Sequence, residues 1–197
     1  MFMIRPPPLP GESLSSWRQR AGLANGFIRF PLQVGARYSR DFDRLPPECE
    51  SHWLVDSFRI SNDDIGRMTI DCLGGGLFTH FGKLKKPRWL IPVGARIAGH
   101  GSAYCPRCLE EDLEPYFRLS WRLAFVCSCP VHDCGLVEGC PECGASVWPS
   151  ALRIMPVKQL RSFAHCAACG AMLTGCNIKT QTDGYSRSLW QALVTGR

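Results

Sequence analysis

The chain has 197 residues, a mass of 22.0 kDa, twelve cysteines and a formal net charge of +6. A hydrophobic content of 45% with 10% aromatics predicts a folded protein of one ordinary or two small domains, which excludes a large enzyme core beside the cysteine-rich region. No apolar stretch approaches the roughly 20 residues that span a bilayer, and the start lacks an apolar signal-peptide core. We therefore expect a soluble protein of the reducing cytoplasm.

The chain opens with a proline-rich arm that leads into a helix. Four prolines within residues 1–10 predict an extended arm, because proline fixes φ and disfavours helix in the preceding residue. Ser13 is suited to cap a helix that ends at Asn25-Gly26, with an apolar stripe at Leu14, Trp17, Ala21 and Ala24. Arg18 and Arg20 lie off this stripe, which favours a solvated face over contact with nucleic acid.

Two further short helices follow. One is expected from about Ser51 to Phe58, and the next is capped by Ser61 and ends at the glycines from Gly74 to Gly76. The expected buried side of this last helix carries Ile65, Met68 and Cys72. The order of these helices is compatible with a helix-turn-helix-like domain.

A basic, irregular segment runs from Phe78 to Ile97. It contains the candidate nucleic-acid-binding residues Lys83, Lys85, Lys86 and Arg88 beside Trp89. A solvated surface is the more common role of so few cations, so both interpretations stay open. Gly94, Gly99 and Gly101 place the expected domain boundary at about residue 100.

The middle of the chain carries two sets of four metal-ligand residues. Each set combines two knuckles in which two ligands are separated by two residues, a spacing that presents both to one zinc ion. The first set is Cys105, Cys108, Cys129 and His132; the second is Cys140, Cys143, Cys166 and Cys169. The sequence thus predicts two structural Zn²⁺ ions, with no open position for an activated water and no catalytic residues.

The spacing leaves open which knuckles share a zinc ion and whether neighbouring Cys and His residues take part. Sequential use of the knuckles is our prediction, although the short link from His132 to Cys140 also permits an interleaved cross-brace. Cys127, Cys134 and His165 adjoin proposed ligands. Spacing predicts that Cys127 and Cys134 are spare, although Cys134 could replace His132 in a distorted knuckle, and His165 is expected to lie beside the ligands without binding the metal or to be exposed. Cys49, Cys72 and Cys176 are expected to be small buried apolar groups.

Charge separates the two halves of the chain. Residues 1–100 hold fourteen Lys or Arg against nine Asp or Glu, whereas residues 101–175 hold six against seven. Seven thiolates around two zinc ions make the second half more acidic, which disfavours phosphate binding there. Glu110, Glu111 and Asp112 are expected in the first turn of a short helix rather than in a catalytic acid cluster.

These features predict a small, mostly α fold with irregular zinc-ribbon or zinc-finger modules. Residues 1–100 form the arm and the helix-turn-helix-like domain, and residues 101–175 form the tandem zinc-finger module, with its first site at 105–132 and its second at 140–169. Residues 176–197 form a short C-terminal helix, in which Leu189, Trp190 and Leu193 lie close in helical phase.

Several segments together resemble the TniQ/TnsD family of Tn7-like transposons. The opening Arg5-Pro6-Pro7-Pro8-Leu9-Pro10-Gly11-Glu12-Ser13-Leu14 leads to Trp17 and Asn25-Gly26. Tyr104-Cys105-Pro106-Arg107-Cys108-Leu109-Glu110-Glu111-Asp112 is then followed by Trp121-Arg122-Leu123 and by the two knuckles Cys129-Pro130-Val131-His132 and Cys140-Pro141-Glu142-Cys143. The resemblance covers nearly the whole chain.

The resemblance implies a non-catalytic adaptor in the choice of insertion site. Family members link a target recogniser, either their own DNA-binding extension or a Cas effector complex with guide RNA, to an AAA+ ATPase transposition regulator. We expect the arm and first helix, including Trp17 and Arg18, to bind the ATPase. Larger relatives carry a further C-terminal DNA-reading domain, so a compact adaptor with weak direct DNA contact fits this chain better; homodimer formation stays open. The alternative is a sequence-specific DNA-binding regulator.

Overall fold

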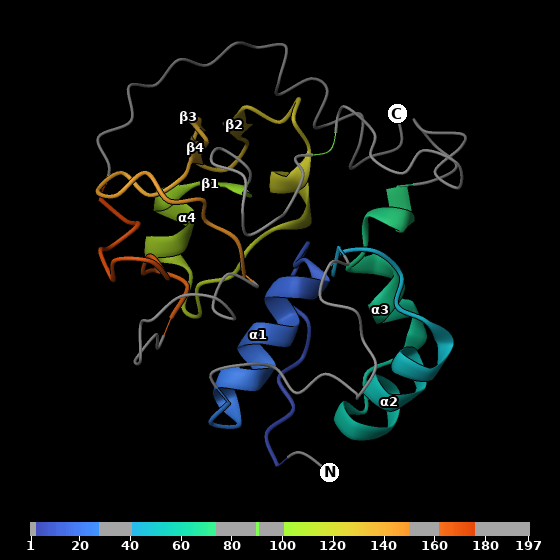
Figure 1. Cartoon of the computed structure of the whole chain (residues 1–197). Coiled ribbons are helices and arrows are strands. Elements are labelled where there is room, and N and C mark those ends of the chain that lie inside the picture. Colours follow the sequence, from blue (N-terminus) through green and yellow to red (C-terminus); the bar gives the residue numbers. More distant parts are fainter. Residues whose placement is uncertain (1–2, 28–40, 74–89, 91–100, 150–161, 176–197) are drawn as a thin grey trace.

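The computed structural model describes residues 3–27, 41–73, 90, 101–149 and 162–175. Figure 1 shows α1 between the pair α2 and α3 on one side and a cysteine-rich half on the other. None of the helices in these residues combines the length and the apolar character needed to cross a membrane. The predicted C-terminal helix at 176–197 lies outside the described residues.

The first helix begins and ends as predicted. α1 spans Leu14–Ala24, and the side chain of its N-cap Ser13 accepts a hydrogen bond from the backbone N–H of Ser16 at 3.3 Å. Leu14, Trp17 and Ala21 of its predicted apolar stripe face a core formed with the next two helices, whereas Ala24 is half-buried and lies outside that core. The Trp17 ring meets Phe58 edge-on at 5.3 Å. The core residues are Leu14, Trp17, Ala21, Leu54, Phe58, Ile60, Ile65 and Met68.

The next two helices differ from prediction in their bounds. α2 spans Glu48–Phe58, so it begins three residues before the predicted Ser51. α3 spans only Asn62–Arg67, capped by Ser61 as predicted, and the chain then tightens into the 3₁₀ helix η1 at Ile70–Leu73. Cys72 is exposed, so its predicted burial is wrong, because the change of helix type after Arg67 shifts the angular position of residue 72. The helix-turn-helix assignment stays a prediction.

The cysteine-rich half consists of very short elements. α4 spans Pro106–Glu111 and η2 spans Leu119–Arg122; the strands are β1 (Ala103–Tyr104), β2 (Ser128–Cys129), β3 (Cys134–Gly135) and β4 (Val137–Glu138). β1 pairs with β4 and β2 with β3, both antiparallel. Phe117 lies at the centre of the core, with the rings of Trp121 and Phe163 edge-on at 5.6 and 5.4 Å. Elements this small bury little apolar area by themselves, and the predicted aromatic residues Tyr104, Phe117 and Trp121 supply much of their core.

The two halves are joined through backbone hydrogen bonds next to the arm. Glu12 and Arg118 form an isolated antiparallel bridge, the N–H of Ser13 donates to the carbonyl of Phe117 at 3.0 Å, and the N–H of Leu119 donates to Gly11. A third apolar cluster packs at the same junction: Ile70, Leu90, Leu119, Leu123 and Val126. The domain boundary near residue 100 stays a prediction, but packing among the described residues spans it.

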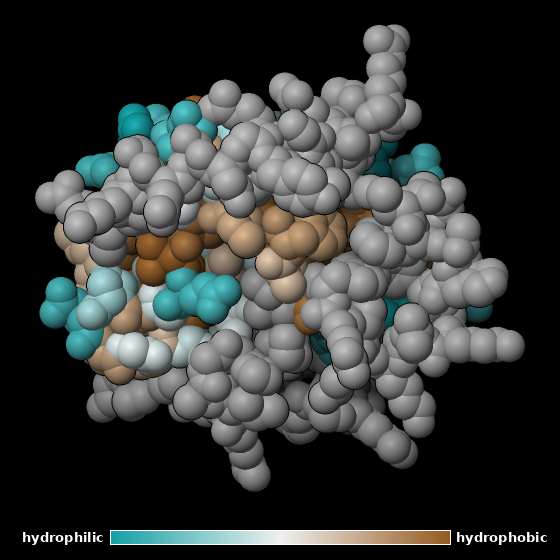
Figure 2. Space-filling model, turned by 90° about the horizontal axis from the view of Figure 1, so that it is seen from above, coloured by the Kyte–Doolittle hydropathy of each residue, from teal (hydrophilic) through white to brown (hydrophobic). Residues whose placement is uncertain are grey.

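Hydrophobic residues also reach the surface. On the face shown in Figure 2, they gather in a band across the described part of the surface, with hydrophilic residues along its edges. The exposed large apolar side chains of the described ranges are distributed among separate segments, with Met3 and Ile4 in the arm, Phe27 after α1, and Leu113 after α4.

Candidate metal centres

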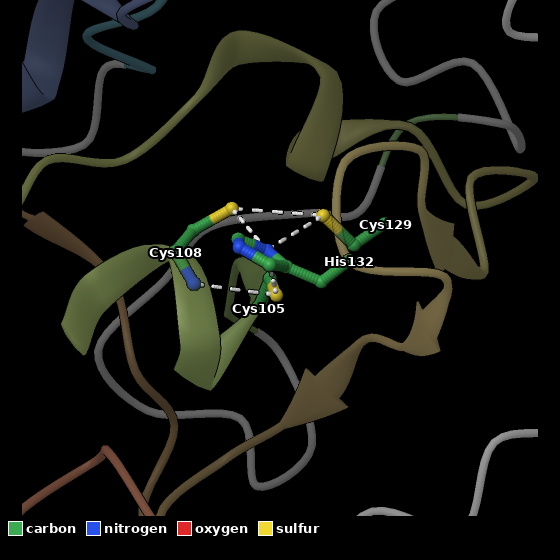
Figure 3. A group of neighbouring side chains, drawn as sticks. All are labelled: Cys105, Cys108, Cys129 and His132. Carbon is green, nitrogen blue, oxygen red and sulfur yellow. Dashed lines mark hydrogen bonds between the residues drawn. The ribbon is translucent and has the colours of Figure 1, made fainter. Parts of the chain in front are cut away.

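The first centre gathers the four predicted ligands around one point (Figure 3). The Nδ1 atom of His132 lies 3.4, 3.3 and 3.6 Å from the sulfurs of Cys105, Cys108 and Cys129, and the last two sulfurs are 3.6 Å apart. Sulfurs bound to one zinc at about 2.3 Å in a tetrahedron lie about 3.8 Å from each other, and a sulfur and a nitrogen slightly less. The spacing therefore fits a single zinc ion.

A helix supplies the first two ligands. Cys105 is the N-cap of α4, its sulfur accepts a long hydrogen bond from the N–H of Cys108 at 3.5 Å, and Pro106 occupies the first turn, where its missing N–H costs nothing. Cys129 ends strand β2, and His132 follows in a turn closed by the N–H of Asp133 donating to the carbonyl of Cys129. The three cysteines are buried, and the His132 side chain is only 7% exposed.

The second centre is an all-cysteine site. The sulfurs of Cys140 and Cys169 lie 3.7 Å apart, and those of Cys143 and Cys166 lie 3.8 Å apart, again the edge length of a zinc tetrahedron. Cys140 and Cys166 are buried, whereas Cys143 and Cys169 are exposed. Both tetrads bring consecutive knuckles together, which is the arrangement that sequential use predicts and differs from the interleaved alternative. That these side chains bind zinc stays a prediction.

Two glycines shape the knuckles of this second centre. Gly144 and Gly170 have φ of +68° and +79°, and their N–H groups donate to the carbonyls of Cys140 and Cys166 at 2.8 and 2.9 Å. Glycine adopts this left-handed conformation without steric cost, so it can close the turn directly after the last ligand. In the first centre Asp133 takes the same role with φ of 52°. The glycines directly after Cys143 and Cys169 are a sequence signal from which this geometry could have been predicted.

Hydrogen bonds and burial shift the pKa values of the thiols in both clusters. In the first centre, hydrogen bonds from Cys108 and Cys129 lower the pKa of Cys105 to about 2, whereas the hydrogen bond to Cys105 raises the pKa of Cys108 far above its usual value. In the second, the backbone N–H of Ala171 lowers the pKa of Cys169, and burial raises that of Cys166 to about 12. Each cluster thus contains a thiol with a lowered pKa beside a thiol with a raised pKa. A divalent cation would favour several thiolates at once.

The carboxylate of Glu111 contacts a ligand of the first centre. The Nε2 atom of His132 lies 2.8 Å from Oε2 of Glu111, and this hydrogen bond lowers the pKa of Glu111. Glu111 is the last residue of α4, so its predicted position in a first turn is wrong: the helix begins at Pro106, inside the knuckle, because Cys105 itself is the cap. Asp112 then pairs with both terminal nitrogens of Arg118.

The neighbouring residues predicted to be spare lie outside both tetrads. The sulfur of Cys134 is buried and lies 3.5 Å from that of Cys105, whereas Cys127 is exposed. His165 forms an isolated bridge with Met172 beside the second centre. Their spare role stays a prediction. Cys49, like Cys72, is exposed, so its predicted burial is wrong; Cys176 lies outside the described residues.

The arginines of the first helix are not a solvated face. Arg18 and Arg20 are each 4% exposed, so this prediction is wrong. Arg18 forms an ion pair with Glu50 at 2.7 Å, and Arg20 pairs with Glu12 at 2.9 Å and with Glu114 at 2.7 Å. An apolar-stripe argument misses this because each arginine meets a carboxylate from a distant or preceding segment.

The predicted partner-binding residue Trp17 is also internal. Its indole N–H donates to the carbonyl of Pro6 at 3.0 Å, and Arg20 donates to the carbonyl of Pro7 at 2.6 Å, so both side chains hold the arm against α1. Binding of a partner by the arm and first helix stays a prediction. The candidate nucleic-acid-binding residues Lys83, Lys85, Lys86 and Arg88 lie outside the described residues.

A buried arginine joins the first centre's half to the helical half. Arg122 of η2 is 1% exposed and pairs with Asp41 at 2.8 Å and with Asp43. Asp43 also accepts the N–H of Ser15 in α1 at 2.8 Å. Burial alone would lower the pKa of Arg122, but the two carboxylates raise it overall. No sequence spacing indicated this pairing, since the partners are about 80 residues apart.

The structure is that of a small helical protein with two tetrads of Cys and His side chains, each suited to hold one structural zinc ion with four protein ligands. The TniQ family model matches residues 3–136, well over half of the chain, and the chain therefore belongs to the TniQ family. This membership associates it with Tn7-like transposition. The match includes α1 to α3 and the first centre and ends before Cys140, the first ligand of the second centre. A search of curated proteins finds no match.

Proposed function

We propose that this protein is a non-catalytic adaptor in target-site selection for Tn7-like transposition. It links a target recogniser, for which a Cas effector complex with guide RNA is one candidate, to an AAA+ ATPase regulator. Family membership is the observation that carries this proposal. The closed tetrads support it, because four protein ligands leave zinc no position at which to activate water or substrate.

The arm supplies the surface that we propose meets the ATPase. Trp17 and Arg20 hold its backbone, and the side-chain amide of Asn25 pairs with both the N–H and the carbonyl of Ile4 at 3.0 and 2.7 Å. The side chain of Met3 is 94% exposed and that of Ile4 is 49% exposed. A fastened arm with outward apolar side chains suits protein contact, since little ordering entropy remains to be lost on binding. In this proposal Trp17 acts indirectly, by supporting that surface, and Arg18, which pairs with Glu50 of α2, acts by holding α1 against α2.

Pull-down of the ATPase regulator by the full chain tests this proposal. Replacing Met3 and Ile4 together by serine should abolish capture while zinc content and melting temperature stay unchanged. Leu113→Ser is the matched control, because Leu113 is fully exposed but lies after α4. Unchanged capture by the double variant would contradict the role of the arm, and failure of the wild-type chain to capture the ATPase would contradict the adaptor itself.

Gel shifts separate the adaptor from a DNA-binding regulator. With Arg18 and Arg20 engaged in buried ion pairs, these two side chains are not available for phosphates. We expect weak binding that is equal for random and defined duplexes and falls steeply with salt, or none. Tight, sequence-selective binding by the isolated protein would instead identify a regulator.

A further inference from the structure

The two ring nitrogens of His132 have different partners. Its Nδ1 atom points at the three sulfurs of the first centre, whereas Nε2 lies 2.8 Å from Oε2 of Glu111 (the ring is drawn in Figure 3). A neutral imidazole carries one proton, and the nitrogen without it is the metal ligand. An ionised carboxylate only accepts hydrogen bonds, so its presence at Nε2 keeps the proton there and leaves the Nδ1 lone pair free.

The helix α4 carries this carboxylate in register with two of the ligands. Cys105, Cys108 and Glu111 are spaced by three residues, so they follow one another along one side of the helix. Arg107 holds the other carboxylate oxygen of Glu111 at 3.3 Å from the preceding turn. The helix α4 and its N-cap thus provide two sulfurs of the first centre and also a carboxylate that holds the ring of His132, which comes from a different segment.

We propose that Glu111 is the positioning residue of the first centre, which fixes the tautomer and the orientation of His132 for Nδ1 coordination. The inference follows from this contact and does not depend on the adaptor role. The four ligands of the second centre are all cysteines, which have no ring to orient. The metal affinity of that centre should therefore not change when Glu111 is replaced, and it serves as an internal control. Carboxylates that hold a ligating histidine typically change metal affinity by about 10- to 100-fold.

Competition between the full chain and a zinc chelator tests this proposal, with ¹¹³Cd-substituted protein used to assign each affinity to its centre. Glu111→Ala should weaken the first centre by about 10- to 100-fold and leave the second unchanged. Glu111→Gln, which retains an acceptor oxygen, should recover part of the loss. ¹⁵N-histidine NMR of the metal-loaded variants should show a protected Nε2–H on His132 in the wild type that becomes solvent-exchanging in Glu111→Ala.

Glu110→Ala is the matched control, because Glu110 has the same charge and helix but shows no hydrogen bond or ion pair within the described ranges. Its affinity should equal that of the wild type. Equal weakening by Glu110→Ala and Glu111→Ala would reveal a general charge effect and overturn the proposal, as would wild-type affinity in Glu111→Ala. If Glu111→Ala does not fold, Glu111→Met, which keeps the length of the side chain but has no acceptor oxygen, replaces it, and a wild-type affinity with an unchanged Nε2–H signal in that variant would overturn the proposal equally.

Discussion

The two metal centres share a ligand geometry but differ in their surroundings. The first is buried at three of its four ligands and lies in the half that is fastened to α1 by backbone hydrogen bonds and by Arg122. The second exposes Cys143 and Cys169 and belongs to a segment beyond the residues that the family model matches. The buried Cys140 and Cys166 of the second centre share one core with the first. Because the first centre lies nearer the junction with α1 along the chain, we expect a zinc ion there to stabilise the helical half more than a zinc ion in the second centre would.

The largest expected effect separates the centres by removing one ligand from each. Cys108→Ala should lose the first metal and, with it, the order of α1, because structural zinc contributes roughly 10–16 kcal/mol of folding free energy in small modules. Cys143→Ala should lose only the second metal. Zinc content and hydrogen exchange of the α1 amides measure both results. Equal protection of α1 in the two variants would remove the distinction between the centres.

Breaking the buried ion pair should uncouple the two halves without touching a ligand. Arg122→Met leaves the buried Asp43 and the partly buried Asp41 without their cation, and the loss of one partner of a buried pair costs about 3–5 kcal/mol of unfolding free energy. Urea denaturation of the zinc-loaded protein measures it. Arg107→Met is the control, because the ion pair of Arg107 with Glu111 is exposed and should contribute at most about 0.5 kcal/mol. A loss below that of the control would contradict the bracing role.

Exposure predicts the order in which the centres lose their metal. Thiolates react according to their accessibility, so a mild oxidant or a chelator should release zinc from the second centre first, through Cys143 and Cys169. Mass spectrometry after alkylation of the released thiols identifies which cysteines became free. Early labelling of Cys105 or Cys108, which are buried, would reverse the comparison.

The smallest expected effect concerns the residue that closes each knuckle. Gly170→Ala should cost about 1–2 kcal/mol, since a side chain disfavours the left-handed conformation even though a Cβ there meets nothing within 4 Å. Asp133→Gly at the equivalent place in the first centre should be nearly neutral, because relief of backbone strain is offset by the greater freedom of glycine in the unfolded chain. Thermal melts of zinc-loaded protein resolve the difference, and equal shifts would show that backbone conformation is not the cause.

Local patterns predicted the parts of this molecule that depend on local physics. Ser13 and Ser61 cap helices because their side chains serve backbone groups only three residues away, and the two-residue ligand spacing predicted both tetrads. The bounds of α2 and the change to a 3₁₀ helix after α3 could not be read in this way, because tertiary packing decides where such short helices start and stop.

Long-range pairs were beyond sequence reasoning. Arg18, Arg20 and Arg122 read as surface residues by type, yet each is buried against a carboxylate. Nothing in the spacing of charges selects Glu50, Glu12 or Asp41 as the partners, since the fold must first bring them together. Glu111 is an intermediate case: its place three residues after Cys108 was visible, but the contact with His132 depends on how two knuckles meet.

X-ray absorption at the zinc edge, combined with elemental analysis of the full chain, tests the central claim most directly. Two zinc ions per chain should share seven sulfur ligands and one nitrogen ligand, with no oxygen from water. Well under two equivalents of zinc, or an oxygen in the first coordination shell, would contradict the account of two closed centres.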